Sequence, residues 1–173
     1  MMKNTKQKYA ESLLELLEKH PYEGITISQI CENTSLTRRT FYNNFSSKDE
    51  VVVFICEQSM DEFVAELHRN GVYTLKNIST IFYTVGARKH KIFEALIKND
   101  IFHFLIKTFV ENVKYLAALV PNNPLDKKSE ERQRYTYLFH TVGVLKLYEE
   151  WLRSGMTESP EELSNIYISI VRD

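Results

Sequence analysis

The chain has 173 residues, of which 43% are hydrophobic and 26% are charged, a mixture typical of a soluble globular protein. No stretch reaches the roughly 18 apolar residues that a membrane span needs, and the N-terminus lacks a signal-peptide pattern, so we expect a cytoplasmic protein with no membrane partner. The net charge is −1, so binding to nucleic acid would have to depend on local basic clusters rather than on overall charge.

Glycine and proline are scarce, with 5 and 4 copies in the chain. Strand-rich folds need many tight turns, so this scarcity predicts an all-α fold built from long helices. The cysteines, Cys31 and Cys56, stand alone in apolar stretches without the paired spacing of a metal site. We therefore expect two reduced core thiols and no metal.

The first predicted helix covers residues 6–20 and has one apolar face, formed at helical spacing by Tyr9, Leu13, Leu16 and Leu17. Pro21 ends it. A second helix begins at Thr26. Gln29 follows three residues later, the pattern of a capping box in which each side chain bonds the backbone amide of the other residue.

A tight turn over residues 33–35 leads into a short third helix that begins at Thr37 and buries Phe41 and Phe45. A fourth helix follows and continues to about residue 70. Two short helices joined by a turn of about four residues form a helix-turn-helix, an arrangement that many DNA-binding proteins use.

The polar face of the third helix strengthens this interpretation. If Phe41 and Phe45 face the core, the outward positions hold Arg38, Arg39, Tyr42 and Asn43. An arginine fork matches guanine or a phosphate, an asparagine amide matches adenine, and hydroxyl groups suit phosphate oxygens. Three alternatives stay open at this point. The arginines could be solvated surface charge, and Tyr42 could be a half-buried core ring. Lys48, near the start of the fourth helix, could contact DNA or be plain surface charge.

The second half of the chain predicts further helices over residues 75–85, 91–97, 100–119 and 130–153, and a last one that begins at Ser159-Pro160. Several aromatic residues there could line an effector pocket. The candidates are Phe82, Phe93, Phe102, Phe104, Phe109, Tyr115, Phe139 and Tyr148, with His103 and His140 as polar groups. The alternative is that these aromatic residues form ordinary core and that the histidines are surface or satisfied core residues.

Two long amphipathic helices near the C-terminus suit a four-helix bundle between two subunits. The residues expected at this interface are Val142, Gly143, Leu163, Ile166 and Ile170, with Phe139 beside them. Gly143 would let helices of the two subunits approach closely. The alternative is a glycine needed for packing within one subunit.

Three blocks of the N-terminal half resemble the signature of the TetR family of regulators. They are Ile25-Thr26-Ile27-Ser28-Gln29-Ile30, then Ser35-Leu36-Thr37-Arg38-Arg39-Thr40-Phe41-Tyr42-Asn43-Asn44-Phe45, then Ser47-Lys48-Asp49-Glu50. The resemblance covers about residues 6–55 and is specific, because the last two blocks fall at the expected distance. The chain departs from the family at Ser35, where glycine is common, and at Asn44, where many members have tyrosine or histidine.

This resemblance implies an all-α homodimer of nine or ten helices. Residues 1–47 would form the three-helix DNA-binding domain, and residues 48–173 would form a helical ligand-binding and dimerisation domain. The implied DNA-binding residues are Thr26, Ser28, Thr37, Arg38, Arg39, Thr40, Tyr42, Asn43, Asn44 and Lys48. Residues 135–143 and 151–156 are also similar to the C-terminal domain of regulators related to the dihydroxyacetone-kinase operon activator.

Enzymatic motifs are missing from the sequence: we find no phosphate-binding loop, no GxSxG and no HExxH. We therefore expect a transcription regulator that is not an enzyme and needs no cofactor. Its expected partners are double-stranded operator DNA, a second copy of the chain, and a small-molecule or protein effector. A repressor released by a small molecule is the favoured hypothesis. The alternative is a helical protein-binding adaptor of the same fold that binds no operator.

Overall fold

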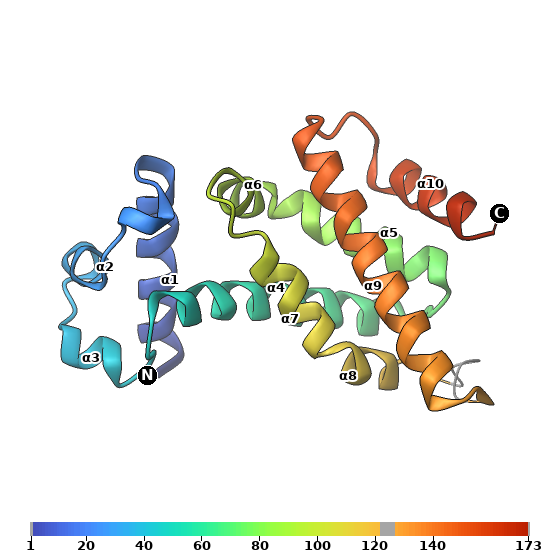
Figure 1. Ribbon diagram of the computed structural model, residues 1–173, viewed down its shortest axis with the longest axis horizontal. Coiled ribbons are helices and arrows are strands. Elements are labelled where there is room, and N and C mark those ends of the chain that lie inside the picture. Colours follow the sequence, from blue (N-terminus) through green and yellow to red (C-terminus); the bar gives the residue numbers. More distant parts are fainter. Residues whose placement is uncertain (1, 122–126, 173) are drawn as a thin grey trace. The chain divides into compact units, whose positions relative to one another are not determined.

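The structure is a computed structural model that describes residues 2–121 and 127–172. These residues form ten α-helices and one short 3-10 helix (Figure 1). The helices are α1 (Met2–Lys19), η1 (Tyr22–Gly24), α2 (Ile27–Thr34), α3 (Arg38–Tyr42), α4 (Lys48–Asn70), α5 (Leu75–Arg88), α6 (His90–Lys98), α7 (His103–Glu111), α8 (Val113–Ala118), α9 (Glu130–Arg153) and α10 (Pro160–Arg172). The all-α class is confirmed. Within the described ranges, no helix is both long and apolar enough to span a lipid bilayer.

One predicted helix differs from the structure. Residues 100–119 were expected to form a single helix, but they contain α7 and α8, which are separated at Asn112. The Nδ2 of Asn112 donates a 2.9 Å hydrogen bond to the carbonyl of Thr108. Asparagine side chains compete with backbone hydrogen bonding in this way, which makes them unfavourable inside helices.

The chain divides into two compact units, Met1–Gln58 with Lys91–Leu105, and Ser59–His90 with Ile106–Asp173. This grouping differs from the predicted boundary after residue 47, because residues beyond α6 bond to the N-terminal helices. The Oδ1 of Asn99 accepts a 2.9 Å hydrogen bond from the backbone amide of Tyr22, and its Nδ2 donates to the carbonyl of Leu17 at 3.3 Å. Such pairing between residues distant in sequence leaves no trace in local periodicity.

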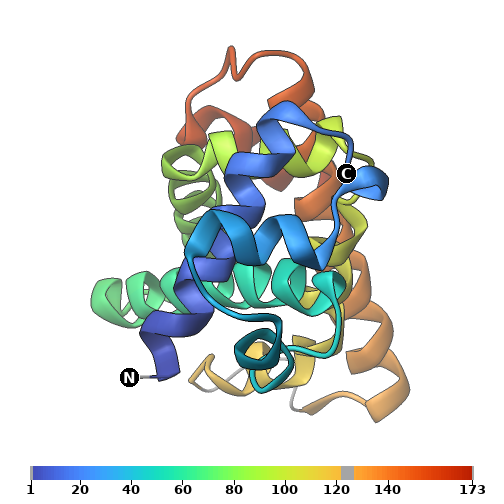
Figure 2. The same ribbon diagram turned by 90° about the vertical axis from the view of Figure 1, so that its left-hand side faces the viewer.

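The core of the first unit lies between α1, α2 and α3. Tyr9 of α1 is fully buried, and its ring meets Phe41 of α3 edge-on at 5.1 Å between centroids. The Ser12 hydroxyl donates a 3.0 Å hydrogen bond to the carbonyl of Ile30, which fastens α1 to α2. Figure 2 views this unit from the side on which α2 crosses α1. Burial of these side chains fixes the orientation of the helix-turn-helix.

Aromatic rings fill the core of the second unit. Phe82 of α5 contacts Phe63, Phe109 and Tyr148 edge-on, with ring centroids 5.5–5.8 Å apart. The helix α10 packs along α5, where the buried hydroxyls of Ser79 and Ser164 lie 2.6 Å apart. These contacts join α4, α5, α7, α9 and α10 into one framework.

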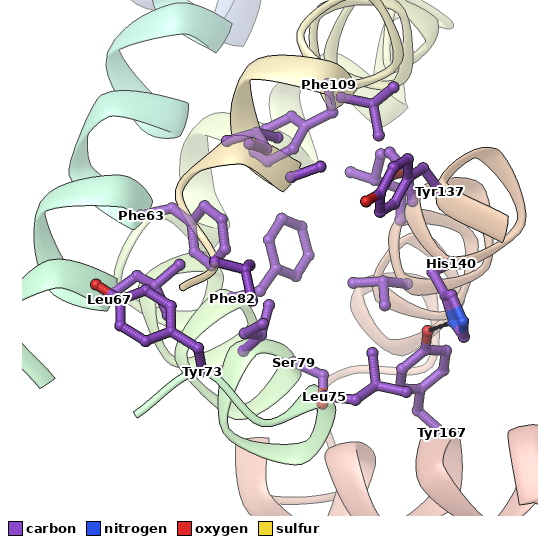
Figure 3. Close-up of a pocket in the computed structure, with 18 of the residues that line it drawn as sticks. Phe63, Leu67, Tyr73, Leu75, Ser79, Phe82, Phe109, Tyr137, His140 and Tyr167 are labelled. Carbon is purple, nitrogen blue, oxygen red and sulfur yellow. Dashed lines mark hydrogen bonds between the residues drawn. The ribbon is translucent and has the colours of Figure 1, made fainter. Parts of the chain in front are cut away.

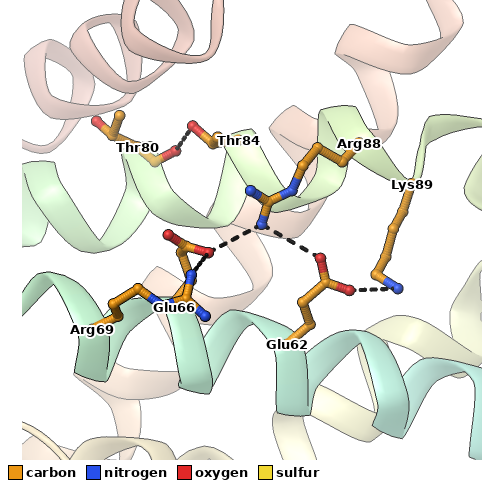
Figure 4. Close-up of polar contacts among 7 residues, drawn as sticks. All are labelled: Glu62, Glu66, Arg69, Thr80, Thr84, Arg88 and Lys89. Atoms are coloured by element: carbon orange, nitrogen blue, oxygen red, sulfur yellow. Dashed lines mark hydrogen bonds and ion pairs between the residues drawn. The ribbon is translucent and has the colours of Figure 1, made fainter.

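Ion pairs also link α4 to α5 (Figure 4). Arg88 bonds Glu62 and Glu66 at 3.4 and 3.3 Å, and Lys89 bonds Glu62 at 2.7 Å. These groups are partly exposed, and such pairs contribute little to stability because water screens them. The α4–α5 contact therefore rests on burial of Phe63 and Phe82 more than on charge.

Candidate nucleic-acid interface and regulatory cavity

The start of α2 is fixed by its own side chains. The backbone amide of Gln29 donates to Thr26 Oγ1 at 3.3 Å, and the backbone amide of Thr26 donates to Gln29 Oε1 at 2.8 Å. The predicted capping box is therefore confirmed. Thr26 is exposed and Ser28 is half-buried in the first turn of α2. Both hydroxyls lie beside backbone N–H groups at a helix N-terminus, where anions are favoured.

The turn between α2 and α3 contains a strained residue. Ser35 has φ 57 and ψ 22, the left-handed conformation that glycine adopts without steric cost. Its backbone amide donates to the carbonyl of Glu32 at 3.4 Å. This turn needs a positive φ, which explains why glycine is common at the equivalent place in the TetR signature.

Thr37 fixes the start of α3. Its Oγ1 accepts a 3.2 Å hydrogen bond from the backbone amide of Thr40, and the two threonine hydroxyls lie 3.0 Å apart. Its carbonyl accepts a 3.2 Å hydrogen bond from the hydroxyl of Tyr9. The first turn of α3, which carries the arginines, is therefore anchored directly to α1.

The outer face of α3 is polar, as the sequence pattern indicates. Phe41 is fully buried, whereas Arg38, Arg39 and Asn43 are exposed. Within the described part of the chain, neither guanidinium pairs with a carboxylate. The Tyr42 side chain is 51% exposed, so it is not a core ring. This surface presents two cations, a phenol and an amide to solvent.

Asn44 and Lys48, two more of the predicted DNA-binding residues, are engaged within the chain. The Nδ2 of Asn44 donates a 2.8 Å hydrogen bond to the carbonyl of Thr40. The Lys48 ammonium donates to the carbonyls of Tyr22, Ile25 and Glu23 at 2.7, 3.0 and 3.3 Å. A phosphate contact by Lys48 would have to replace at least one of these bonds.

A cavity of about 550 Å³ lies within the second unit (Figure 3). Six of the residues that form its apolar walls are Phe63, Leu67, Phe82, Phe109, Leu116 and Val144. Its volume falls within the range of small-molecule sites, roughly 300–1,000 Å³. The sequence missed most of these residues, because spacing identifies an apolar face but does not tell whether that face meets core, solvent or a cavity.

The structure places only some of the predicted pocket residues at this cavity. Phe82 and Phe109 line the cavity, whereas Phe93, Phe102, Phe104, Tyr115, Phe139 and Tyr148 do not. Phe102 belongs to the first unit. Tyr115 and Phe139 are 54% and 61% exposed on the surface. Tyr148 is buried beneath Phe82, and its hydroxyl donates a 2.9 Å hydrogen bond to the carbonyl of Gly86.

One polar pair lies at the cavity wall. The Nδ1 of His140 and the hydroxyl of Tyr167 share a hydrogen bond that links α9 to α10 (Figure 3). Burial lowers the pKa of His140 and raises that of Tyr167 to about 12, because desolvation disfavours each charged form. Both groups are therefore neutral near pH 7. His103, the other histidine singled out from the sequence, is exposed at the start of α7.

The predicted dimer residues separate into two groups. Ile166 and Ile170 of α10 are 42% and 56% exposed, and Val142 and Gly143 of α9 are half-buried. Leu163 is 5% exposed in the single subunit, which contradicts the prediction that its side chain is available to a dimer interface. Its position on α10 faces into the subunit, with Tyr167 one turn later. Exposed Phe139 and Leu138 extend the apolar surface on α9, and we call these α9 and α10 residues, without Leu163, the apolar face.

Comparisons with known proteins agree with this architecture. Residues 11–53 match the family described as bacterial regulatory proteins, tetR family. Residues 72–173 match the family described as transcriptional regulator C-terminal region. A TetR transcriptional regulator from Streptococcus agalactiae 2603V has the same fold, with a TM-score of 0.65 and 17% identity over 98% of this chain and 94% of that one.

Two curated relatives are similar in sequence. An uncharacterized HTH-type transcriptional regulator from Bacillus subtilis (strain 168), YxbF, is 26% identical over 96% of this chain and 44% of its own length. The HTH-type dhaKLM operon transcriptional activator DhaS from Lactococcus lactis is 24% identical over 71% of this chain and 59% of its own length. The chain thus spans about half the length of these relatives. Together with the helix-turn-helix geometry, the matches show that this chain belongs to the TetR family of transcription regulators and has a DhaS-like C-terminal region.

Proposed function

We propose that this protein binds operator DNA as a homodimer and represses transcription until a small-molecule effector releases it. The observation that carries the proposal is the exposed polar face of α3, on which Arg38, Arg39 and Tyr42 face solvent while Phe41 anchors the helix. The second helix of a helix-turn-helix enters the major groove with its N-terminal residues against the base edges. The arginine pair stands at that end of α3.

The remaining side chains supply phosphate contacts in this proposal. Thr26 and Ser28 stand at the N-terminus of α2, while Thr37 and Thr40 open α3. Hydroxyls and backbone N–H groups at such ends bind phosphate and set the register of a protein on the duplex. Tyr42 adds a phenol, Asn43 adds an amide for a base edge, and Asn44 and Lys48 contribute support from within the chain.

Dimerisation is supported by the apolar face. Phe139, Leu138 and Val142 recur at three- and four-residue spacing on α9, and Ile166 and Ile170 do so on α10. A second copy that covers this surface would bury it at roughly 25 cal/mol per Å² of apolar area. An isologous dimer also presents two recognition helices to the two halves of a palindromic operator.

Effector release is supported by the cavity in the second unit. The 550 Å³ space is bounded by α4, α5, α7, α8, α9 and α10. A molecule held there can shift the population of DNA-binding conformations only if it prefers one of them. Repression with release by the effector is the simplest use of such a site.

Selection of DNA fragments from a random pool, followed by binding assays at several salt concentrations, tests operator binding. Affinity should fall steeply as salt rises, because phosphate contacts release counterions. Arg39→Ala should cost about 1–3 kcal/mol and relax base preference at one position. Arg132→Ala, which removes an exposed arginine at the start of α9, is the matched control and should bind normally. Wild-type protein that retains no DNA at low salt would instead favour the protein-binding adaptor.

A further inference from the structure

The cavity in the second unit has walls that restrict the chemistry of its occupant. We infer that the effector is an uncharged, largely apolar molecule with a single hydrogen-bonding end, which the His140–Tyr167 pair receives. This inference rests on the proposed function, in which the cavity holds the effector.

The described walls of the cavity carry no charged side chain. Among the described residues that line the cavity, none is a lysine, arginine, aspartate or glutamate. His140 is the one lining histidine among them, and burial lowers its pKa, so it supplies no positive charge at neutral pH. Moving an ion from water into such surroundings is very costly without a partner of opposite charge. A carboxylate, phosphate or ammonium ligand therefore finds no counter-ion among these described lining residues.

Several polar lining groups are already used by the chain itself. The Ser79 hydroxyl lies 2.6 Å from that of Ser164 and donates to the carbonyl of Lys76. The Thr74 side chain caps α5 by accepting from the backbone amide of Asn77. The Tyr73 hydroxyl bonds the ring of His68. These groups contribute little to ligand recognition in their present state.

The polar end of a ligand is best served on the α9 side. The shared bond with Tyr167 occupies Nδ1 of His140 and leaves Nε2 as the second hydrogen-bonding position of the ring. Thr141 stands next to His140 in the chain and also lines the cavity. In Figure 3 this corner lies across the cavity from Phe63, Leu67 and Tyr73, of which only Tyr73 has a polar group, a hydroxyl that bonds His68. A molecule with one hydroxyl, ester or amide end matches this asymmetry.

Displacement of a neutral fluorophore, N-phenyl-1-naphthylamine, from the full chain at pH 7.5 tests the ligand class. The competitors share one alkyl chain and differ in charge: decan-1-ol, decanoate and decyltrimethylammonium, each below its micelle concentration. Decan-1-ol should displace the fluorophore at a concentration at least about tenfold lower than either ion. Equal or tighter binding of an ion would overturn the inference, as would failure of every probe to bind.

Two variants test the place and orientation of the ligand. Tyr167→Phe keeps the ring but removes the hydroxyl, and it should weaken decan-1-ol about three- to tenfold while butylbenzene, which has no polar end, binds as before. Tyr115→Phe makes the same change at an exposed tyrosine outside the cavity and should alter neither affinity. Val144→Phe should fill the cavity and weaken both compounds. Equal effects of Tyr167→Phe and Tyr115→Phe would overturn the assigned polar corner.

DNA binding measured on the same preparations, without ligand, separates this inference from the proposed function. Protein that binds DNA but prefers decanoate contradicts the ligand class alone. Protein that binds decan-1-ol as expected but retains no DNA contradicts the regulator proposal alone. Thermal melting of each variant shows whether a lost affinity reflects the cavity or a failure to fold.

Discussion

The ammonium of Lys48 lies 4.3 Å from the centre of the Tyr22 ring and donates a 2.7 Å hydrogen bond to the carbonyl of the same residue. This pairing joins the first turn of α4 to η1, the turn that leads into α2. Tyr22 is itself held, because its hydroxyl donates to Asp49. The family resemblance assigns Lys48 to DNA contact. In the structure it instead holds η1 in place, and η1 leads into α2, the first helix of the helix-turn-helix.

Lys48→Met should lower the free energy of unfolding by about 1–3 kcal/mol, because three carbonyl groups lose a charged donor. If Lys48 acts only through the fold, the salt dependence of DNA binding will keep its slope. A slope reduced by about one counter-ion would instead show a direct phosphate contact. Lys19→Met, which alters an exposed lysine at the end of α1, serves as the control.

Ser35→Gly should stabilise the protein. Ser35 has φ 57, a conformation that costs a side-chain-bearing residue about 1–2 kcal/mol, and glycine relieves most of this cost. The greater freedom of glycine in the unfolded chain offsets part of the gain, so we expect roughly 0.5–1 kcal/mol. The same change at helical Ser28 should lower stability. Chemical denaturation measures both, and a less stable Ser35→Gly protein would refute the role given to strain.

Gly86→Ala should destabilise the second unit by about 1–3 kcal/mol, because it overpacks the core. A Cβ at residue 86 would lie 2.7 Å from the Tyr148 ring, closer than any van der Waals contact allows. At Gly143 the nearest atom to such a Cβ is 3.9 Å away on Tyr167, so Gly143→Ala should fold normally. If Gly143 lies at the dimer interface, this second variant will weaken association instead. Melting curves and sedimentation distinguish the two effects.

Phe139→Glu should convert the dimer into monomers with little loss of folding. Phe139 is 61% exposed in one subunit, so its removal leaves no internal cavity, whereas a charge there opposes burial against a second copy. Sedimentation velocity measures the result. Tyr115→Glu alters a similarly exposed ring on α8 and should leave the assembly unchanged. Dimers that persist in the Phe139→Glu protein would move the interface elsewhere.

Stability should fall as the pH drops below about 6.5, the ordinary pKa of histidine. Burial lowers the pKa of His140 in the folded protein, so the unfolded chain binds the proton more readily and acid favours unfolding. The stability that neutral His140 contributes is fully present above about pH 6.5, and it is lost as the pH falls from there through the lowered pKa of the folded protein. His140→Gln does not titrate there and should flatten the profile of melting temperature against pH between 5 and 7. An unchanged profile would place the titrating group elsewhere.

The N-terminal half was predictable from the sequence because its determinants are local. The capping box of Thr26 with Gln29 is made by residues close along the chain. The outward position of Arg38 and Arg39 follows from helical periodicity once Phe41 is buried. The sequence showed Ser35 at a place where the family often has glycine, but the positive φ of Ser35 is a finding of the structure.

The second half depended on tertiary packing. Phe82 and Phe139 look alike in the sequence, yet one lines a cavity and the other faces solvent. The family resemblance assigns Lys48 to DNA contact, but only the fold shows that its ammonium donates to the carbonyl of Tyr22, 26 residues earlier. Sequence alone determined where most helices form and which face of each is apolar, because propensity, caps and periodicity act over a few residues; the break between α7 and α8 at Asn112 was the exception. Which partner covers each face was decided by contacts between distant segments, and that choice exists only once the chain has folded.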